Sequence, residues 1–245
     1  MKKIILNSFI IPKYNKFGKF LRPIKSFQLR SRYLKEKKID FLKKYFFLFG
    51  INFKNSLINI HTFYSNDRLP IILDIGFGNG ESLFYTCSHF INCNILGIEV
   101  YLAGIYNFIK KIFCTKKIFH NLKIIMHDAV EVLQYMIQNN SISIVQCFFP
   151  DPWPKKRHNK RRIINKQFIE LVITKMILGG ILHIITDCVL YYNNIIKLMK
   201  NFKYFVDISK KYDHDIINNK IKTKFSNQAS LHCVNNFNII FQLIK

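Results

Sequence analysis

Acidic residues are scarce in this 245-residue chain: 14 Asp and Glu stand against 38 Lys and Arg, a formal net charge of +24. This imbalance favours a polyanionic partner, because each phosphate that a cation neutralises releases condensed counterions. The chain is also crowded with Lys, Asn, Ile and Phe, a drift expected from an AT-rich genome, so excess lysine alone does not define a functional surface. Arginine is more informative, because only seven are present and three of them lie at Arg157, Arg161 and Arg162.

Paired cysteines and long apolar runs are also missing. The six cysteines are scattered with no CxxC pair, which argues against a zinc site and a disulfide framework and is typical of a reducing compartment. No apolar run approaches the ~20 residues that a membrane-spanning helix needs. Asn7 and Ser8 interrupt the apolar stretch MKKIILNSFII, and no small-residue cleavage site follows. We therefore expect a cytoplasmic protein without a metal or a membrane partner.

From Leu69 onward, short apolar runs alternate with longer amphipathic stretches. We expect buried strands at 71–75, 94–98, 123–126, 144–148 and 181–185. We expect helices near 81–90, 102–113, 129–138, 165–178 and 189–202. This alternation predicts an α/β fold with a mostly parallel sheet. Right-handed crossovers then place the strand carboxyl ends along one edge, where open α/β sheets bind ligands.

Residues 1–60 differ from the rest, and we expect them to form a basic arm and a helix attached to a domain at 61–245. The first 50 positions hold fourteen Lys and Arg but two acids. Apolar residues at helical spacing predict a helix from Leu29 to Phe49. The preceding segment KFLRPIKSFQLRSR is predicted to be irregular. Its interleaved aromatic residues and arginines favour contact with nucleic acid, although a solvated surface segment has a similar composition.

The stretch LDIGFGNGE (73–81) predicts a strand that enters a glycine-rich turn and then a helix. Gly76, Gly78 and Gly80 permit positive φ and a close approach of a ligand to the backbone. A dinucleotide fingerprint needs its third glycine where Glu81 stands, and a carboxylate there repels a pyrophosphate. A P-loop is excluded, because no Gly-Lys-Ser/Thr follows. The turn therefore favours a nucleoside cofactor without phosphate, and S-adenosylmethionine fits this description.

One carboxylate follows each of four consecutive predicted strands. Asp74 can accept from the cofactor ammonium, Glu99 from both ribose hydroxyls and Asp128 from the adenine amino group. Asp151 follows the fourth strand, close to the expected position of the methyl group. Singly, such residues also fit a turn, a solvated loop or a helix N-cap. Because the chain has only 14 acids, the four acids together favour a cofactor site more strongly than any one of them does alone.

The segment FFPDPWPKKRHNKRR (148–162) combines an acid, prolines, the only tryptophan and a run of cations. The prolines stiffen the turn that carries Asp151 and Trp153. The acid can accept from base N–H groups, and the ring can stack on a purine, which contributes about 1–3 kcal/mol. Alternatively, Trp153 covers the core and the cations form a general polyanion patch. The position at the ligand-binding edge favours a nucleic-acid base as substrate.

Taken in order, LDIGFGNGES, GIEV, MHDAVEVL, FFPDPWPKKRHNKRR, GGILHIITD and TKF closely resemble the bacterial tRNA (guanine-N7)-methyltransferases, from about Phe17 to the C-terminus. The resemblance implies a Rossmann-like class I methyltransferase fold, with a mostly parallel seven-stranded sheet and helices on both faces. It implies S-adenosylmethionine as cofactor and tRNA as partner. It matches Asp74, Glu99, Asp128 and Asp151 to cofactor-contacting acids, and Asp151 to the catalytic position. It also matches the following residues to substrate or RNA contacts: Lys155, Arg157, His158, Asn159, Lys160, Arg161, Arg162, Asp187, Thr223, Lys224, Phe225 and Ser226.

Ser226 departs from the family pattern, which has Glu there, so one guanine contact is in question. Two alternatives remain open: methyl transfer to an exocyclic amino group (N2 or N6) of RNA or DNA, and a non-catalytic RNA-binding protein on the same fold. Guanine N7 carries an in-plane lone pair and no proton. For N7 transfer we therefore expect Asp151 to orient the guanine and the sulfonium rather than to remove a proton.

Overall fold

A computed structural model of the chain describes residues 13–14, 20–21, 24–27, 34–210 and 236–245. The three arginines of KFLRPIKSFQLRSR (Arg22, Arg30 and Arg32) lie outside these ranges, and so do four of the expected substrate residues: Thr223, Lys224, Phe225 and Ser226.

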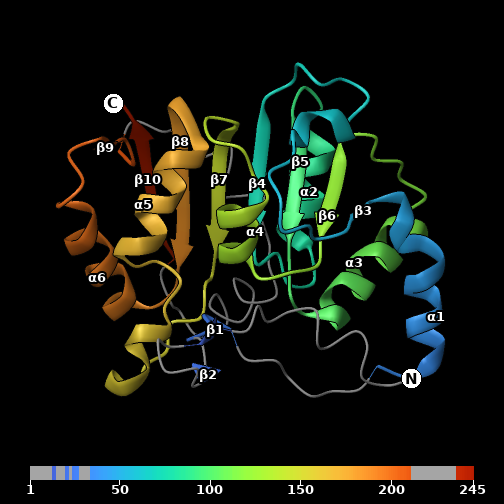
Figure 1. Ribbon diagram of the computed structural model, residues 1–245, viewed down its shortest axis with the longest axis horizontal. Helices are drawn as coiled ribbons and strands as arrows, with labels where there is room; N and C mark the ends of the chain where they lie inside the picture. The colour runs from blue at the N-terminus through green and yellow to red at the C-terminus, as the bar shows by residue number, and fades with distance from the viewer. Residues whose placement is uncertain (1–12, 15–19, 22–23, 28–33, 211–235) are drawn as a thin grey trace.

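The centre of the fold is an eight-stranded mixed sheet (Figure 1) with the order β3-β6-β5-β4-β7-β8-β10-β9. Five strands are parallel and largely buried, apart from the exposed residues 177–179 of the last: β4 (Ile71–Ile75), β5 (Asn94–Ile98), β6 (Leu122–Ile125), β7 (Ile142–Phe148) and β8 (Met176–Thr186). Strand β10 (Phe237–Leu243) runs antiparallel to β8 and to the edge strand β9 (Phe205–Asp207). The short strand β3 (Gly50–Ile51) extends the other edge beside β6. A separate pair is formed by β1 (Lys13–Tyr14) and β2 (Phe20–Leu21).

Helices cover both faces of the sheet, as Figure 1 shows. One apolar cluster packs α4 (Ala129–Tyr135), α5 (Lys166–Lys175) and α6 (Val189–Met199) on one face. A second cluster packs α2 (Glu81–His89) and α3 (Leu102–Cys114) on the opposite face, with α1 (Glu36–Tyr45) outside α3. Three short 3-10 helices complete the described elements: η2 (Phe46–Leu48), η3 (Ile60–Phe63) and η4 (Lys156–Arg161).

The sequence prediction of five buried parallel strands is confirmed, and the ends differ by a few residues. The helix predicted over 165–178 is wrong in its last three residues, because α5 ends at Lys175 and Met176 pairs with Ile142 at the start of β8. Met176, Ile177 and Leu178 are apolar and extend the apolar pattern of the helix, and the glycines at 179 and 180 separate them from the apolar run at 181–185, so the sequence places the start of this strand in the helix. The sheet has eight strands rather than seven because β3 adds to the β6 edge. Within the described residues, no helix combines the length and apolarity that crossing a membrane requires.

Candidate active site

Acidic residues line one edge of the sheet. Since β4 to β8 are parallel, their carboxyl ends meet at the same edge. Following the sheet order, Asp128 lies after β6, Glu99 after β5, Asp74 near the end of β4, Asp151 after β7 and Asp187 after β8. We call this row the acid rim. The prediction that the first four acids share one edge is confirmed.

The turn between β4 and α2 leaves room for a ligand. Gly76, Gly78 and Gly80 have φ angles of 72°, 57° and 78°, and Gly80 caps α2 in a left-handed conformation. A Cβ at Gly76 or Gly78 would meet no atom within 4 Å. At Gly80 a Cβ would clash with the Phe108 ring. Gly80 is therefore needed for packing and for its backbone conformation, whereas the first two glycines face open space.

Glu99 holds this turn against the end of β5. Its Oε2 accepts from the Gly78 amide at 2.7 Å, and its Oε1 accepts from the amides of Val100 and Tyr101 at 2.7 and 2.8 Å. Burial raises the pKa of this carboxyl, and the three backbone hydrogen bonds oppose that rise. Each carboxylate oxygen has a second lone pair. Glu99 can therefore order the turn and still accept a bond from a ligand hydroxyl.

Asp74 carries an unsatisfied oxygen in the middle of the rim. The residue is 1% exposed, and its Oδ2 accepts from the Ser82 hydroxyl at 3.3 Å. Its Oδ1 is buried without a hydrogen-bond donor. Burial raises the Asp74 pKa to about 7, with a further increase from Glu99 and an opposing effect of Ser82. A buried acceptor without a donor is costly, so this site fits a ligand that brings an N–H donor, and above all a cationic one.

Asp128 begins α4 and forms an ion pair with the arm. Its Oδ1 accepts from the Val130 amide at 3.0 Å, which confirms the N-cap alternative. Its Oδ2 lies 2.7 Å from the Lys25 ammonium, which also binds Glu131 at 2.6 Å. The second oxygen of Glu131 binds His127 at 2.7 Å. No local pattern predicted a role for Lys25, Glu131 or His127, although the last two lie within the quoted stretch MHDAVEVL.

The turn after β7 holds its tryptophan inside the protein. Trp153 is 8% exposed, its indole N–H donates to the Ser26 carbonyl at 3.1 Å, and the Arg161 guanidinium lies 4.9 Å from the ring centroid. The prediction that this ring offers an open stacking face to a purine is therefore wrong. Phe149 and Trp153 both have positive φ, 52° and 45°, a strained arrangement on either side of Asp151. Asp151 and Pro154 are the exposed residues of this turn, and Pro152 is half-buried.

The cations that follow divide into two groups. Lys155, Arg157 and Lys160 are exposed, together with Lys156 and Asn159, whereas His158 and Arg161 are half-buried. Arg162 is buried, donates from Nε to the Pro152 carbonyl at 2.7 Å and lies over the Tyr191 ring. Its position does not fit the predicted RNA contact, because the side chain fastens the turn from inside. Asp187, the remaining described site residue, is half-buried beyond β8.

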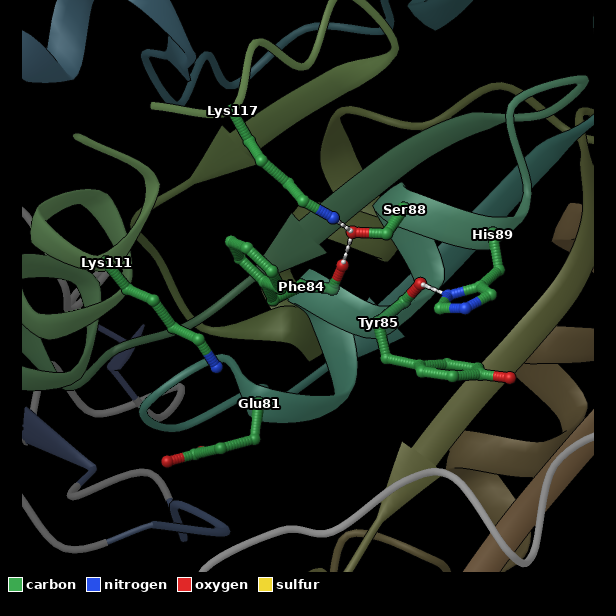
Figure 2. A pocket seen from close by; sticks show the side chains of 7 residues that line it. All are labelled: Glu81, Phe84, Tyr85, Ser88, His89, Lys111 and Lys117. Carbon is green, nitrogen blue, oxygen red and sulfur yellow. Dashed lines mark hydrogen bonds between the residues drawn. The ribbon is translucent and has the colours of Figure 1, made fainter. Parts of the chain in front are cut away.

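A separate cavity of about 310 Å³ lies between α2 and α3. Figure 2 shows Lys111 and Lys117 on either side of Phe84 there, with Lys117 bonded to Ser88. Its acidic residue is Glu81, at the start of α2, and none of the acid-rim residues lines it. Its other lining residues are Tyr85 and His89. No group of His, Cys, Asp and Glu in the described ranges has the arrangement of a metal site.

Five parallel strands in the order β6-β5-β4-β7-β8, an antiparallel β10, a glycine turn and an acid rim define a class I methyltransferase fold. The family model Methyltransf_4, described as "Putative methyltransferase", matches residues 68–238. A tRNA (guanine-N(7)-)-methyltransferase of Buchnera aphidicola subsp. Baizongia pistaciae is 41% identical over 95% of each chain. The protein of the same name from Salmonella typhimurium is 37% identical over 85% of this chain and 86% of its own. The chain belongs to the tRNA (guanine-N7)-methyltransferase family.

Among solved structures, an antibiotic-related methyltransferase matches 75% of this chain and 89% of its own at 13% identity, with a TM-score of 0.49. The fold assignment rests on the strand order given above.

Proposed function

We propose that this protein transfers a methyl group from S-adenosylmethionine to N7 of a guanine in tRNA. The observation that carries the proposal is the acid rim, in which the unsatisfied Asp74 oxygen lies beside an open glycine turn and Asp151 stands next to exposed cations. The family relatives named above support the choice of tRNA and of guanine N7.

The residues of the rim fit the cofactor in a definite order. Asp74 would accept from the ammonium of the amino-acid tail, over the backbone of Gly76 and Gly78. Glu99 would accept from the ribose hydroxyls and Asp128 from the adenine amino group. This assignment follows the order of β4, β5 and β6 in the sheet, and it supplies a donor for the buried Asp74 oxygen.

Asp151 would act by orientation. When bound, S-adenosylmethionine supplies a methyl group on a sulfonium cation, which the lone pair of guanine N7 can attack in line. Because N7 carries no proton, no residue needs to act as a base on it. Asp151 would accept from the guanine N–H groups and, as an anion, favour the cation beside it. Positioning of this kind accounts for large rate effects when the reacting atoms are held at about 3 Å.

The exposed cations of η4 and its flanks would bind the tRNA backbone. We expect the double variant Arg157→Ala/Lys160→Ala to weaken tRNA binding. It should also lower the salt dependence of log Kd by about one unit for each phosphate that the variant no longer neutralises. Affinity for S-adenosylhomocysteine should not change. Filter binding across a salt series measures the first effect and calorimetry the second.

Arg162→Met is the matched comparison for that variant, because the buried Arg162 fastens the turn. It should lower the melting temperature clearly and change the salt dependence of log Kd for tRNA only slightly. If both variants change the salt dependence equally, the division of the cations into surface and buried groups is incorrect.

The direct test is incubation of the protein with S-adenosylmethionine labelled in its methyl group and unmodified tRNA, followed by nucleoside mass spectrometry. We expect the label on N7 of guanosine. Label on an N2 or N6 amino group would favour the amino-methyltransferase alternative, and tRNA binding without label would favour a non-catalytic protein.

We also propose that residues 1–60 serve as an RNA-contacting arm and helix on a methyltransferase domain at 61–245, and that the protein works in the cytoplasm with tRNA. The free thiols of Cys87, Cys93, Cys114, Cys147 and Cys188 support a reducing location. The arm is not independent of the domain, since α1 packs against α3 and β3 pairs with β6.

A further inference from the structure

Two consecutive residues of the arm contact the two ends of the site. The Lys25 ammonium binds Asp128, after β6, and the Ser26 carbonyl accepts from the Trp153 indole, after β7. Strands β5 and β4 lie between β6 and β7 in the sheet. The segment Ile24–Phe27 therefore connects the expected adenine end of the rim to the turn that carries Asp151.

Lys25 is the charge that holds two neighbouring carboxylates together. Asp128 and Glu131 lie three residues apart, their side chains are 6% and 8% exposed, and Lys25 reaches both. Burial lowers the Lys25 pKa, but the bonds to Asp128 and Glu131 outweigh burial and raise it, so the ammonium stays charged. Without this cation, the two carboxylates would repel each other in a poorly solvated place.

The network continues away from the site and fixes the position of Glu131. His127 binds Glu131 at 2.7 Å and stacks on Phe53, with the ring centroids 3.8 Å apart and the planes 9° from parallel. Lys25 takes one acceptor position of Asp128 and the Val130 amide takes another. A carboxylate offers about four such positions, so Asp128 can bind Lys25 and an adenine amino group together.

We propose that Ile24–Phe27 is a strap across the acid rim and that Lys25 is a positioning residue, which holds the Asp128 carboxylate in the orientation that recognises the adenine amino group. This inference rests on the proposed function, because it assumes that the rim binds S-adenosylmethionine. It adds a specificity role for an arm residue that has no contact with the reacting atoms.

The test compares two ligands that differ at the adenine amino group: S-adenosylhomocysteine and S-inosylhomocysteine, in which a carbonyl replaces that group. Binding of each is measured by calorimetry to the wild-type protein, Lys25→Met and Lys25→Arg. Lys37→Met serves as the control, because Lys37 is exposed on α1 and its loss changes the net charge equally. Melting temperatures are recorded for all four proteins.

We expect Lys25→Met to weaken binding of S-adenosylhomocysteine about tenfold, the effect of one charge-assisted hydrogen bond, and to leave binding of S-inosylhomocysteine nearly unchanged. Lys25→Arg should retain the preference for S-adenosylhomocysteine over S-inosylhomocysteine, because its guanidinium can bridge both carboxylates. Lys37→Met should behave like the wild type.

Three results would overturn the inference and leave the cofactor site in place. Equal weakening of both ligands would show that Lys25 only supports the fold. Tighter binding of S-adenosylhomocysteine to Lys25→Met would show that Lys25 competes with adenine. A wild-type protein that binds S-adenosylhomocysteine without preference over the inosyl compound would show that Asp128 does not read the amino group. A wild-type protein that binds neither compound would instead refute the cofactor site, and the strap with it.

Discussion

Asp151→Asn should reduce the turnover of tRNA by about 100-fold or more, the loss typical of a group that acts in the transition state. The residue is exposed between the two strained residues of the turn, so the substitution should leave the fold intact. The amide keeps the shape of the side chain but removes the negative charge and one acceptor. Single-turnover kinetics with labelled cofactor measure the loss, and calorimetry with S-adenosylhomocysteine should show a much smaller change in affinity.

A solvent isotope effect separates orientation from proton removal at this residue. If Asp151 orients the guanine, the single-turnover rate of the wild type should be nearly the same in light and heavy water. Glu170→Gln is the control for Asp151→Asn in the turnover measurement, since Glu170 is an exposed acid on α5 that pairs only loosely with Lys166. Near-normal turnover by Asp151→Asn would falsify the proposed role.

Asp74→Asn should weaken the binding of S-adenosylhomocysteine about 100-fold, because it removes the charged partner of the ligand ammonium. The same variant should be more stable than the wild type without ligand. The carboxyl is buried with one unpaired oxygen, and its pKa in the folded protein is about 7, against an ordinary value of 3.8. Ionising it in the folded state costs up to about 4 kcal/mol, a cost that the neutral amide avoids.

The stability that Asp74→Asn gains over the wild type should increase as the pH rises. The unfolded chain releases the Asp74 proton near pH 3.8 and the folded protein only near pH 7, so the folded state binds more protons between these values. The wild type therefore loses stability relative to Asp74→Asn as the pH rises toward 7, and the difference levels off above it. Urea unfolding from pH 5 to 8 measures this, with the exposed Asp67→Asn as control. A difference that is absent or shrinks with rising pH would contradict the assignment.

The sequence predicted the parallel strands and the acid rim because both are local patterns: apolar runs define β4 to β8, and one carboxylate lies near the carboxyl end of each strand from β4 to β7. Strand β10 was missed, although its apolar run is clear, because only its pairing with β8 and β9 makes it part of the sheet. Lys25 was missed because it is one of fourteen early cations, and its partner Asp128 lies 103 positions away.

The interpretation of the segment after β7 was partly wrong for a related reason. Composition shows an aromatic ring and a run of cations, but not which of them face inward. The environment of Trp153 comes from Ser26, in the distant arm, and from Arg161. Arg162 turns inward because the Pro152 carbonyl and the Tyr191 ring both lie within its reach. These are tertiary contacts that no local pattern encodes.

The hydrogen bond from Arg162 to the Pro152 carbonyl spans ten positions and closes the basic segment into a loop. Ordering a loose segment costs about 1–2 kcal/mol per residue in backbone entropy. An incoming RNA would meet cations whose backbone is already fixed. Binding would therefore cost little further backbone entropy. Pre-organisation of this surface thus depends on a side chain that the RNA itself would never reach.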